Sequence, residues 1–118
     1  MNRPTRARRR YKRYKVIARF WSAQTTRAQV PAYTEHLKSQ VLPTVRKVDG
    51  YAGAMLLERE ASGGVEIIVI TLWRSLDSIR GFAGVDLEKA VVSDEAASLL
   101  TRFDRRVRHY ELVMKDNG

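Results

Sequence analysis

The segment Val65–Trp73 constrains the fold more than any other part of this sequence. Most of its residues are β-branched or aromatic, and β-branched side chains favour an extended backbone. Successive side chains of a strand point to opposite faces of a sheet. One face would therefore carry Ile68, Ile70 and Leu72, and the other Ile67 and Val69. Both faces of this strand must be shielded from water.

Three further segments have the composition of strands. They are 16–21, 51–60 and 106–114. The middle one is joined to the central strand by Ser62-Gly63-Gly64, a sequence typical of a hairpin turn. The four segments together predict an antiparallel sheet.

A helical pattern occupies the region between the first two strands. Apolar residues recur there at spacings of three and four, which places them on one helical face: Val30, Tyr33, Leu37, Val41, Val45 and Val48. Thr26 or Gln29 would cap this helix, and Pro31 suits its first turn. Pro43 predicts a kink or a restart, and Asp49-Gly50 predicts the end.

Shorter helices are predicted after the central strand. Ser75 would cap a helix that contains Ile79 and Phe82 and ends at Gly84. A further helical turn is expected over 86–92, and a third helix over 96–101, opened by Ser93.

The resulting order is β-α-β-β-α-(α)-β, which predicts an α+β protein with the ferredoxin-like split βαβ arrangement. Its antiparallel sheet would have helices on one face only. The strands are apolar on both faces, and a chain of 118 residues has no second layer for the open one. We therefore expect a second copy to cover it, forming a homodimer.

The net charge of +9 is unevenly distributed. Residues 1–15 contain eight Lys and Arg and no acidic residue, and removing these from the 22 of the whole chain leaves 14, against 13 Asp and Glu. We interpret residues 1–14 as a basic, disordered tail and residues 15–115 as one domain. The tail is either a solvated extension or an arm for nucleic acid or anionic membrane, with Tyr11 and Tyr14 available for stacking. The nearly neutral domain argues against nucleic-acid binding elsewhere.

The sequence lacks the residues and motifs that several classes of protein require. The chain has no cysteine, and its two histidines, without an acidic cluster nearby, do not predict a metal site. It contains no glycine-rich nucleotide-binding motif, nucleophile elbow or zinc-protease motif. No apolar run is long enough to span a membrane, and the charged N-terminus has no apolar stretch behind it. A cytoplasmic location is expected.

Motifs from five segments resemble one family. They are Val16-Ile17-Ala18-Arg19-Phe20-Trp21, Tyr33–Leu37, Leu42-Pro43, Asp49-Gly50-Tyr51 leading into Gly53-Ala54, and above all the segment from Leu72-Trp73-Arg74-Ser75 to Phe82-Ala83-Gly84. With His109-Tyr110-Glu111, they resemble the antibiotic biosynthesis monooxygenase family of the dimeric α+β barrel superfamily, over about residues 15 to 114.

The resemblance implies two subunits that press their open sheet faces together, with a cavity between sheet and helices in each. Characterised members of the family oxidise polycyclic phenols to quinones with dioxygen and without metal or flavin. A related branch binds and degrades haem, and others have different reactions or none known.

The candidate catalytic residues are His36 and Trp73. In the family the Trp at the strand end lines the cavity, where its ring would stack on a flat substrate and its indole N–H would donate a hydrogen bond. Neutral imidazole can accept a phenolic proton, and Tyr33, three residues before His36, would position the substrate. The alternatives are a structural Trp73, a core Tyr33 and a half-exposed His36. Candidate substrate-binding residues besides Tyr33 are Ala18, Phe20, Met55 and Phe82.

Two positions depart from the family pattern. Ala18 stands where oxygenase and haem-degrading members commonly have Asn, and Ala83 stands where the haem branch has its axial His. Haem degradation is therefore not expected, and no cofactor is predicted. Arg19 on a buried strand requires a carboxylate, which Glu58, Glu66 or Glu111 would supply. Both Arg19 and His109 are expected to be structural.

The sequence therefore favours a homodimeric, cofactor-independent monooxygenase that acts on an aromatic or polyketide-like molecule in an apolar pocket. The first alternative is a ligand-binding or stress-related barrel of the same fold without catalysis. The second is a protein that binds nucleic acid or a membrane surface through residues 3–15.

Overall fold

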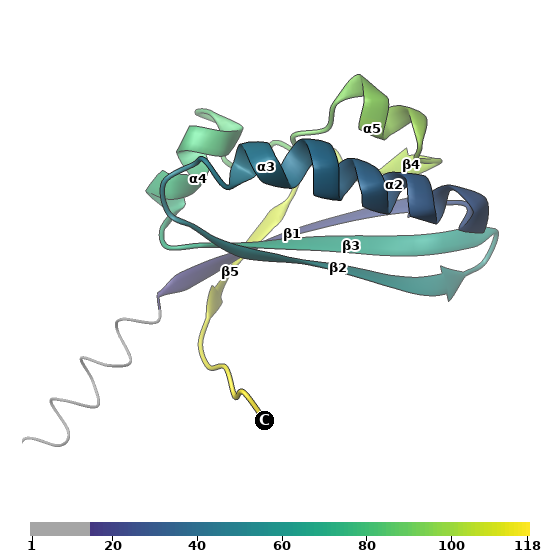
Figure 1. The fold of residues 1–118 in the computed structure, drawn as a ribbon. Helices are drawn as coiled ribbons and strands as arrows, with labels where there is room; N and C mark the ends of the chain where they lie inside the picture. The colour runs from purple at the N-terminus through teal and green to yellow at the C-terminus, as the bar shows by residue number, and fades with distance from the viewer. Residues whose placement is uncertain (1–14) are drawn as a thin grey trace, which may run out of the picture.

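The computed structural model describes residues 15–118, so the predicted tail over 1–14 lies outside the described part. A five-stranded antiparallel sheet carries helices on one face (Figure 1). Its strands are β1 (Val16–Thr25), β2 (Tyr51–Ala61), β3 (Gly64–Trp73), β4 (Arg102–Phe103) and β5 (Arg108–Leu112). The helices are η1 (Arg27–Gln29), α2 (Val30–His36), η2 (Leu37–Val41), α3 (Leu42–Val45), α4 (Leu76–Ala83) and α5 (Asp94–Ser98).

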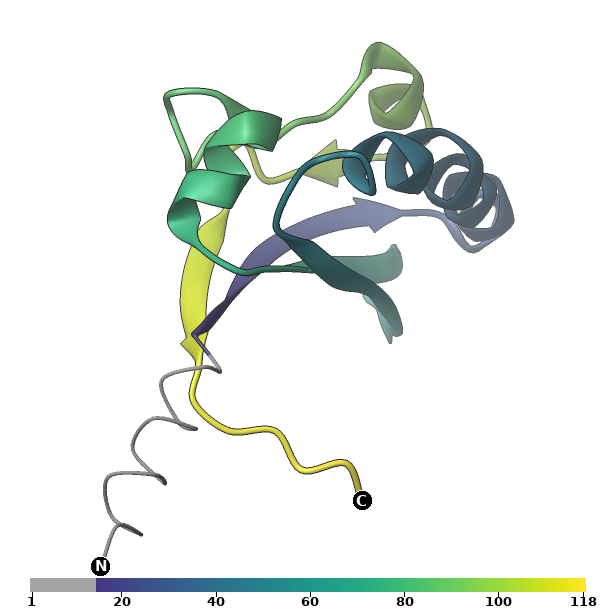
Figure 2. The ribbon, with the colours of Figure 1, turned by 60° about the vertical axis from the view of Figure 1, so that its left-hand side comes forward.

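The sheet has the predicted ferredoxin-like arrangement. Its strand order is β2-β3-β1-β4, and β5 also pairs with β1. The β2–β3 hairpin turns at Ser62 and Gly63, as expected. Rotation of the molecule shows all of the helices above one face of the sheet, while the opposite face has no layer over it (Figure 2). The α+β fold class is confirmed.

The first strand is longer than its apolar run predicts. Residues Ser22 to Thr25 lie beyond the predicted strand segment 16–21, yet they continue β1. The C-terminal half of the chain supplies their partners: Ser22 accepts a backbone hydrogen bond from Asp104, and the Thr25 hydroxyl donates to the Leu99 carbonyl at 2.6 Å. Polar residues remain in a strand where distant segments satisfy their hydrogen bonds.

The first helix is continuous across Pro43, with a π-helical segment directly before it. This segment, η2, has a backbone hydrogen bond from Leu42 to Leu37, five residues back. Proline has no N–H to donate to the preceding turn, and an added residue in that turn relieves the mismatch. The predicted kink or restart at Pro43 thus takes the form of a π-segment. Thr26 caps η1 through its side chain, and Pro31 occupies the first turn of α2, as expected.

The second half departs from expectation in four places. No helix forms over 86–92. One hydrogen-bonded turn runs from Asp86 to Lys89, and the segment otherwise pairs with the chain before β5: Ala90 donates to Arg105 and Val107 donates to Glu88. The helix opened by Ser93 ends at Ser98, earlier than predicted. The last strand is shorter than predicted, and β4 was not predicted at all.

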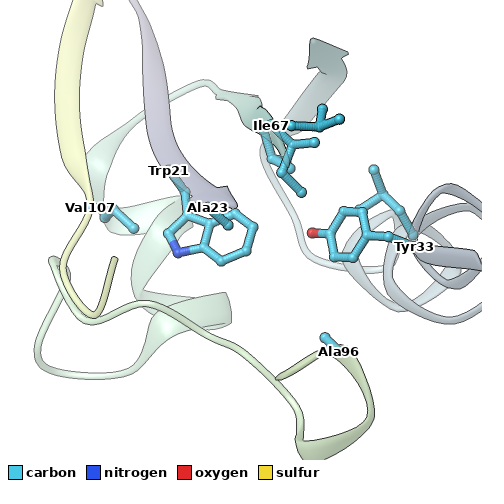
Figure 3. Packing of buried hydrophobic residues seen from close by; sticks show 9 residues of the cluster. Trp21, Ala23, Tyr33, Ile67, Ala96 and Val107 are labelled. Carbon is cyan, nitrogen blue, oxygen red and sulfur yellow. The ribbon is translucent and has the colours of Figure 1, made fainter. Parts of the chain in front are cut away.

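The core under the helices has two ends. At the packed end, Ile17, Val45, Trp73 and Ile79 form a cluster, three of them with at most 1% of their surface exposed. At the cavity end, a larger cluster of nine buried residues includes Trp21 and Tyr33 (Figure 3).

The face away from the helices is also apolar, and we call it the open face. Strand alternation and register place on it Ala18, Phe20, Met55, Leu57, Ile68, Ile70, Leu72, Tyr110 and Leu112. Met55, Leu57 and Tyr110 are about half exposed. Within residues 15–118, none of the helices is long and apolar enough to cross a membrane.

Candidate functional site

A cavity of about 230 Å³ lies between the sheet and the helices, at the cavity end of the core. Its floor comes from β1 and β3, through Arg19, Trp21, Val69 and Thr71. Its roof comes from α2, η2 and α3, and a side wall comes from residues 91–96. The volume is somewhat below the roughly 300–1,000 Å³ of typical ligand pockets, so a small ligand fits best.

His36 lines this cavity as a buried and unpaired imidazole. The residue is 7% exposed, and neither ring nitrogen has a hydrogen-bond partner among residues 15–118. The nearest acidic group is Glu95 on α5, whose Oε1 lies 3.8 Å from Nδ1, beyond hydrogen-bond length. A buried ring with both nitrogens free costs stability, and it can accept or donate a proton to a ligand.

The helix geometry explains why His36 is not half exposed. Two neighbouring rows of the long helix line the cavity: Tyr33, Leu37, Val41 and Val45 in one, and His36, Gln40 and Thr44 in the other. His36 is the last residue of α2 and directly precedes the π-segment. An apolar stripe of ordinary helical spacing does not reveal this second row.

Tyr33 lies beside His36, with ring centroids 6.4 Å apart. It is 5% exposed, and burial raises the pKa of its hydroxyl to about 12. The phenol therefore stays protonated at neutral pH. Its ring stacks near Trp21 with centroids 6.4 Å apart and an interplanar angle of 29° (Figure 3).

Trp21 lines the cavity although the sequence did not single it out. Its Nε1–H donates to the Asp104 carbonyl at 2.8 Å, which holds the indole in place. The alternation of side chains along β1 could have identified Trp21 as a cavity residue, because it places Trp21 on the same face as Arg19 and Ala23.

Trp73 does not line the cavity. It is fully buried at the packed end, where its ring stacks on Phe82 with centroids 5.6 Å apart. Its Nε1–H donates to the Thr71 hydroxyl at 2.8 Å. The prediction that Trp73 and His36 line one cavity is therefore wrong, because α4 packs directly over the end of β3. Phe82 and Thr71, both in contact with Trp73, form the cavity wall instead.

Three of the candidate substrate-binding residues lie away from the cavity. Ala18, Phe20 and Met55 are on the open face, while Phe82 and Tyr33 are in the cavity wall. The physical reason is the strand period: Arg19 and Trp21 point toward the helices, so the residues between them point away. Apolar residues on both faces of the sheet concealed this choice.

Arg19 lies buried in the cavity floor with 4% of its surface exposed. Its Nη1 donates to the Leu87 carbonyl at 2.6 Å and to His109 Nε2 at 3.0 Å, and its Nη2 donates to the Lys89 carbonyl at 2.6 Å. The guanidinium also lies 5.5 Å from the centroid of the Phe82 ring. The expected carboxylate partner is wrong: Glu58, Glu66 and Glu111 make no ion pair with it. Burial lowers the pKa of Arg19 to about 10.

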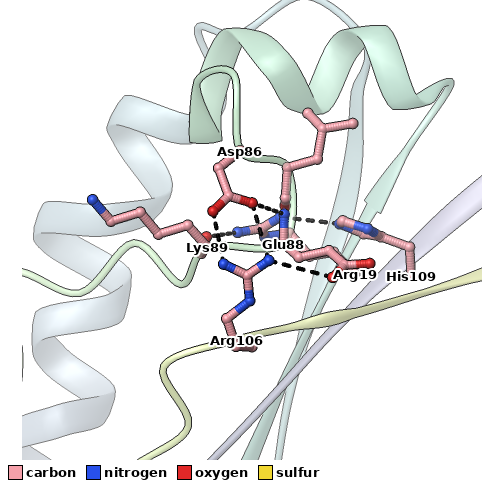
Figure 4. Close-up of polar contacts among 7 residues, drawn as sticks. Arg19, Asp86, Glu88, Lys89, Arg106 and His109 are labelled. Carbon is pink, nitrogen blue, oxygen red and sulfur yellow. Dashed lines mark hydrogen bonds and ion pairs between the residues drawn. The ribbon is translucent and has the colours of Figure 1, made fainter.

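The loop that holds Arg19 is itself fastened by an ion-pair cluster. Arg106 bonds both oxygens of Asp86 at 2.7 and 3.1 Å and reaches Glu88 at 3.4 Å (Figure 4). Burial, and then the charge of Arg19, lower the pKa of His109, while Glu88 acts in the opposite direction. A neutral His109 suits its position, because its Nε2 accepts from a guanidinium that can only donate.

The cavity offers few side chains that ligate metals. Residues 15–118 contain no group of three or more His, Asp or Glu side chains that could hold a metal ion. Of the cavity-lining residues, only His36 has an imidazole, and Ala83 on α4 offers no ligand.

No family model and no curated protein matches this sequence. Solved structures do match its fold. A monooxygenase from the gene ActVA-Orf6 of Streptomyces coelicolor, in complex with the ligand nanaomycin D, is 17% identical with a TM-score of 0.55, over 91% of this chain and 93% of that one. SnoaB, a cofactor-independent oxygenase from Streptomyces nogalater, is 15% identical with a TM-score of 0.54, over 87% and 96%.

A third match is MhuD, solved with two manganese protoporphyrin IX molecules bound per active site. It is 18% identical with a TM-score of 0.55, over 86% of this chain and 99% of that one. Similarity at these identities concerns the fold, and proteins of one fold differ in their chemistry. The chain has the fold of the antibiotic biosynthesis monooxygenase proteins, as the sequence resemblance implied.

Proposed function

We propose that this protein is a monooxygenase that oxidises a small aromatic phenol in the cavity with dioxygen and without a bound cofactor. The observation that carries the proposal is His36, a buried imidazole whose two nitrogens lack partners and which lines an apolar cavity. Fold neighbours that include a cofactor-independent oxygenase support it.

In the proposed reaction, a phenol binds between the aromatic wall of Trp21 and Tyr33 and the side of Phe82. His36 accepts the phenolic proton, which makes the ring electron-rich. The phenolate reduces dioxygen. One oxygen atom forms a bond to a ring carbon, the O–O bond breaks, and the second oxygen leaves as water with the two hydrogens lost by the substrate. The product is a quinone.

The residues around His36 supply a hydrogen-bond donor and an apolar environment for this reaction. Tyr33 keeps its proton, because burial raises its pKa, and therefore offers a hydrogen bond to a carbonyl or phenolate oxygen. Apolar side chains such as Val69 and Val107 line much of the cavity. Expulsion of water by the bound substrate would strengthen the electrostatic interactions in the site and protect reactive intermediates from hydrolysis.

Oxygen uptake tests the proposal. Purified protein is supplied with 1-naphthol, 1,5-dihydroxynaphthalene and anthrone, and oxygen consumption and quinone absorbance are recorded. We expect turnover by the wild type, with kcat reduced at least about 100-fold in His36→Gln, as for loss of a general base. Glu35→Gln is the control, because Glu35 is the exposed neighbour of His36 on α2 and lies outside the cavity lining.

Three results would decide against this proposal. Full turnover in His36→Gln would show that the imidazole is not the base. Binding of the aromatic compounds without oxygen consumption would favour the non-catalytic, ligand-binding alternative. Binding of nucleic acid or vesicles that depends on residues 3–15 would favour the second alternative, a protein that acts through its N-terminal segment.

We also propose that the protein is a homodimer through its open face. The nine apolar residues on this face are contiguous across β2, β3, β1 and β5. A patch of this kind on a lone subunit would be costly in water, and stable interfaces bury about 800 Å² per partner.

Light scattering at micromolar concentration is expected to give a dimer mass. Ile70→Lys, at the centre of the open face, should give a folded monomer. Val85→Lys is the matched control, because Val85 is apolar and 87% exposed but lies in the loop after α4. A monomeric wild type with its fold intact would contradict this part of the proposal.

A further inference from the structure

Arg19 is a buried cation without a buried anion. Its partners are two neutral carbonyls, of Leu87 and Lys89, and the ring of His109. None of the ion pairs within residues 15–118 includes it. Placing an uncompensated charge in a protein interior costs several kcal/mol of folding free energy, and such charges are ordinarily paired.

The rest of the cavity wall supplies no compensating charge. Arg19 is the one cavity-lining residue with a permanent charge, and no Asp or Glu is among them. Glu95, the acid nearest His36, is 71% exposed at its side chain and belongs to the outer surface. The interior of the cavity is therefore apolar with a single fixed positive charge in its floor.

The guanidinium retains capacity for a ligand. It has five N–H donors. Both on Nη1 are taken, by Leu87 and His109, and one on Nη2 is taken by Lys89. One on Nη2 and the one on Nε have no partner within the described residues. The remaining donors can bond the oxygens of a carboxylate or an ionised hydroxyl group.

Hydrogen bonds to the loop over residues 87–89 and to His109 hold the Arg19 side chain in one orientation. The loop carbonyls accept its outer N–H groups, and Arg106 holds that loop through Asp86 and Glu88 (Figure 4). His109 accepts from Nη1 as a neutral ring, and its lowered pKa keeps it so at neutral pH. A pre-oriented cation binds an anion without first losing side-chain entropy.

From this geometry we infer that the cavity selects an aromatic carboxylate, carried on a small flat ring system that also bears the reacting phenol, with Arg19 as the counter-ion of the carboxylate. This inference rests on the proposed function, since it names the substrate class of the same cavity. The anionic oxygen lies toward Arg19 and the stacked rings lie against Phe82, Trp21 and Tyr33. His36, in the roof, faces the part of the ligand that reacts.

Binding alone tests the inference, without turnover. Calorimetry compares 2-naphthoate with 2-acetylnaphthalene, which has the same ring and a neutral carbonyl group. The wild type is expected to bind the anion at least about tenfold more tightly, as a hydrogen bond to a charged group is worth about 1.5–3 kcal/mol. Arg19→Met should lose this preference, and Arg19→Lys should retain part of it. Arg80→Met, which removes an exposed cation of α4 outside the cavity lining, should retain it fully.

The outcomes separate the two proposals. Equal or weaker binding of naphthoate by the wild type, or no binding of either probe at millimolar concentration, would overturn the inference, whatever the variants do. So would an unchanged preference in a folded Arg19→Met protein. If the anion preference fails while phenols still drive oxygen uptake, the inference is wrong and the proposed function stands. If the anion preference holds and no oxygen is consumed, the inference stands and the proposed function is wrong.

Discussion

The two ends of the core use the same strands and the same helix in opposite ways. At the packed end, Trp73 is completely buried and its only polar atom is bonded to Thr71. At the cavity end, Trp21 lies on the same face of the sheet, two residues after Arg19 on β1. One side of its indole ring borders the cavity. His36 there has two unbonded nitrogens.

The difference shows where stability and chemistry are separated in this protein. The packed end is close-packed and has its hydrogen bonds satisfied, as in an ordinary protein interior. The cavity end retains a buried cation and an unpaired imidazole, both of which cost folding free energy. Unfavourable groups of this kind are typical of functional sites.

The largest expected effect comes from removing Trp73. Trp73→Ala leaves a void among Ile17, Val45 and Ile79 and should lower the free energy of unfolding by about 3–5 kcal/mol. Trp21→Ala should cost at least about 1 kcal/mol less, because the side of Trp21 that borders the cavity has fewer packed neighbours. Urea denaturation of both variants measures the difference. Equal losses would break the contrast between the two ends.

Gly50 is expected to have the next largest effect. It adopts a φ of +91°, and a Cβ atom there would lie 1.9 Å from Ser78 Oγ and 2.5 Å from Ser78 Cβ, at the start of α4. Gly50→Ala should therefore destabilise the packed end by about 1–3 kcal/mol.

The control is Gly63→Ala in the hairpin turn, where φ is +80° and an added Cβ meets no atom within 4 Å. It isolates the cost of the backbone conformation from that of the clash. Thermal unfolding of the two variants side by side would contradict the close packing around Gly50 if both lost the same stability.

Replacement of His36 should act in the opposite direction. His36→Leu removes two unpaired buried nitrogens and should raise the free energy of unfolding by about 1 kcal/mol. Gln40→Leu, whose amide is exposed, should give no such gain. A loss of stability in His36→Leu, measured by urea denaturation, would show that the imidazole is satisfied in solution.

The smallest effect expected is a pH dependence from His109. Its folded-state pKa is lowered, so the unfolded chain binds more protons than the folded chain as pH falls below about 6.5. The free energy of unfolding should therefore decrease as the pH falls from about 6.5 toward the lowered pKa of folded His109. Well above pH 6.5 this group should have no effect on it. His109→Gln keeps an acceptor for Arg19 and should remove this component. Identical pH profiles of the two proteins would refute the assignment.

The sequence by itself determined most of the architecture. The consecutive apolar residues of β3, the glycines of the hairpin and the spacing of Tyr33 to Val45 predicted the order of elements and the ferredoxin-like sheet. Ser75 and Ser93 were correctly identified as helix caps, since each hydroxyl accepts from the backbone three residues on. These features are local, and local hydrogen bonding and side-chain period suffice for them.

Only the tertiary structure decided the composition of the site. Strand alternation makes two faces but does not say which one the helices cover, and with both faces apolar, Phe20 and Met55 were assigned to the wrong one. Whether Trp73 or Trp21 borders the cavity depends on how closely α4 packs on β3, which no spacing in the sequence encodes. The partners of Arg19 are backbone carbonyls from a loop about 70 residues away, and a carbonyl, unlike a carboxylate, leaves no trace in the choice of side chain.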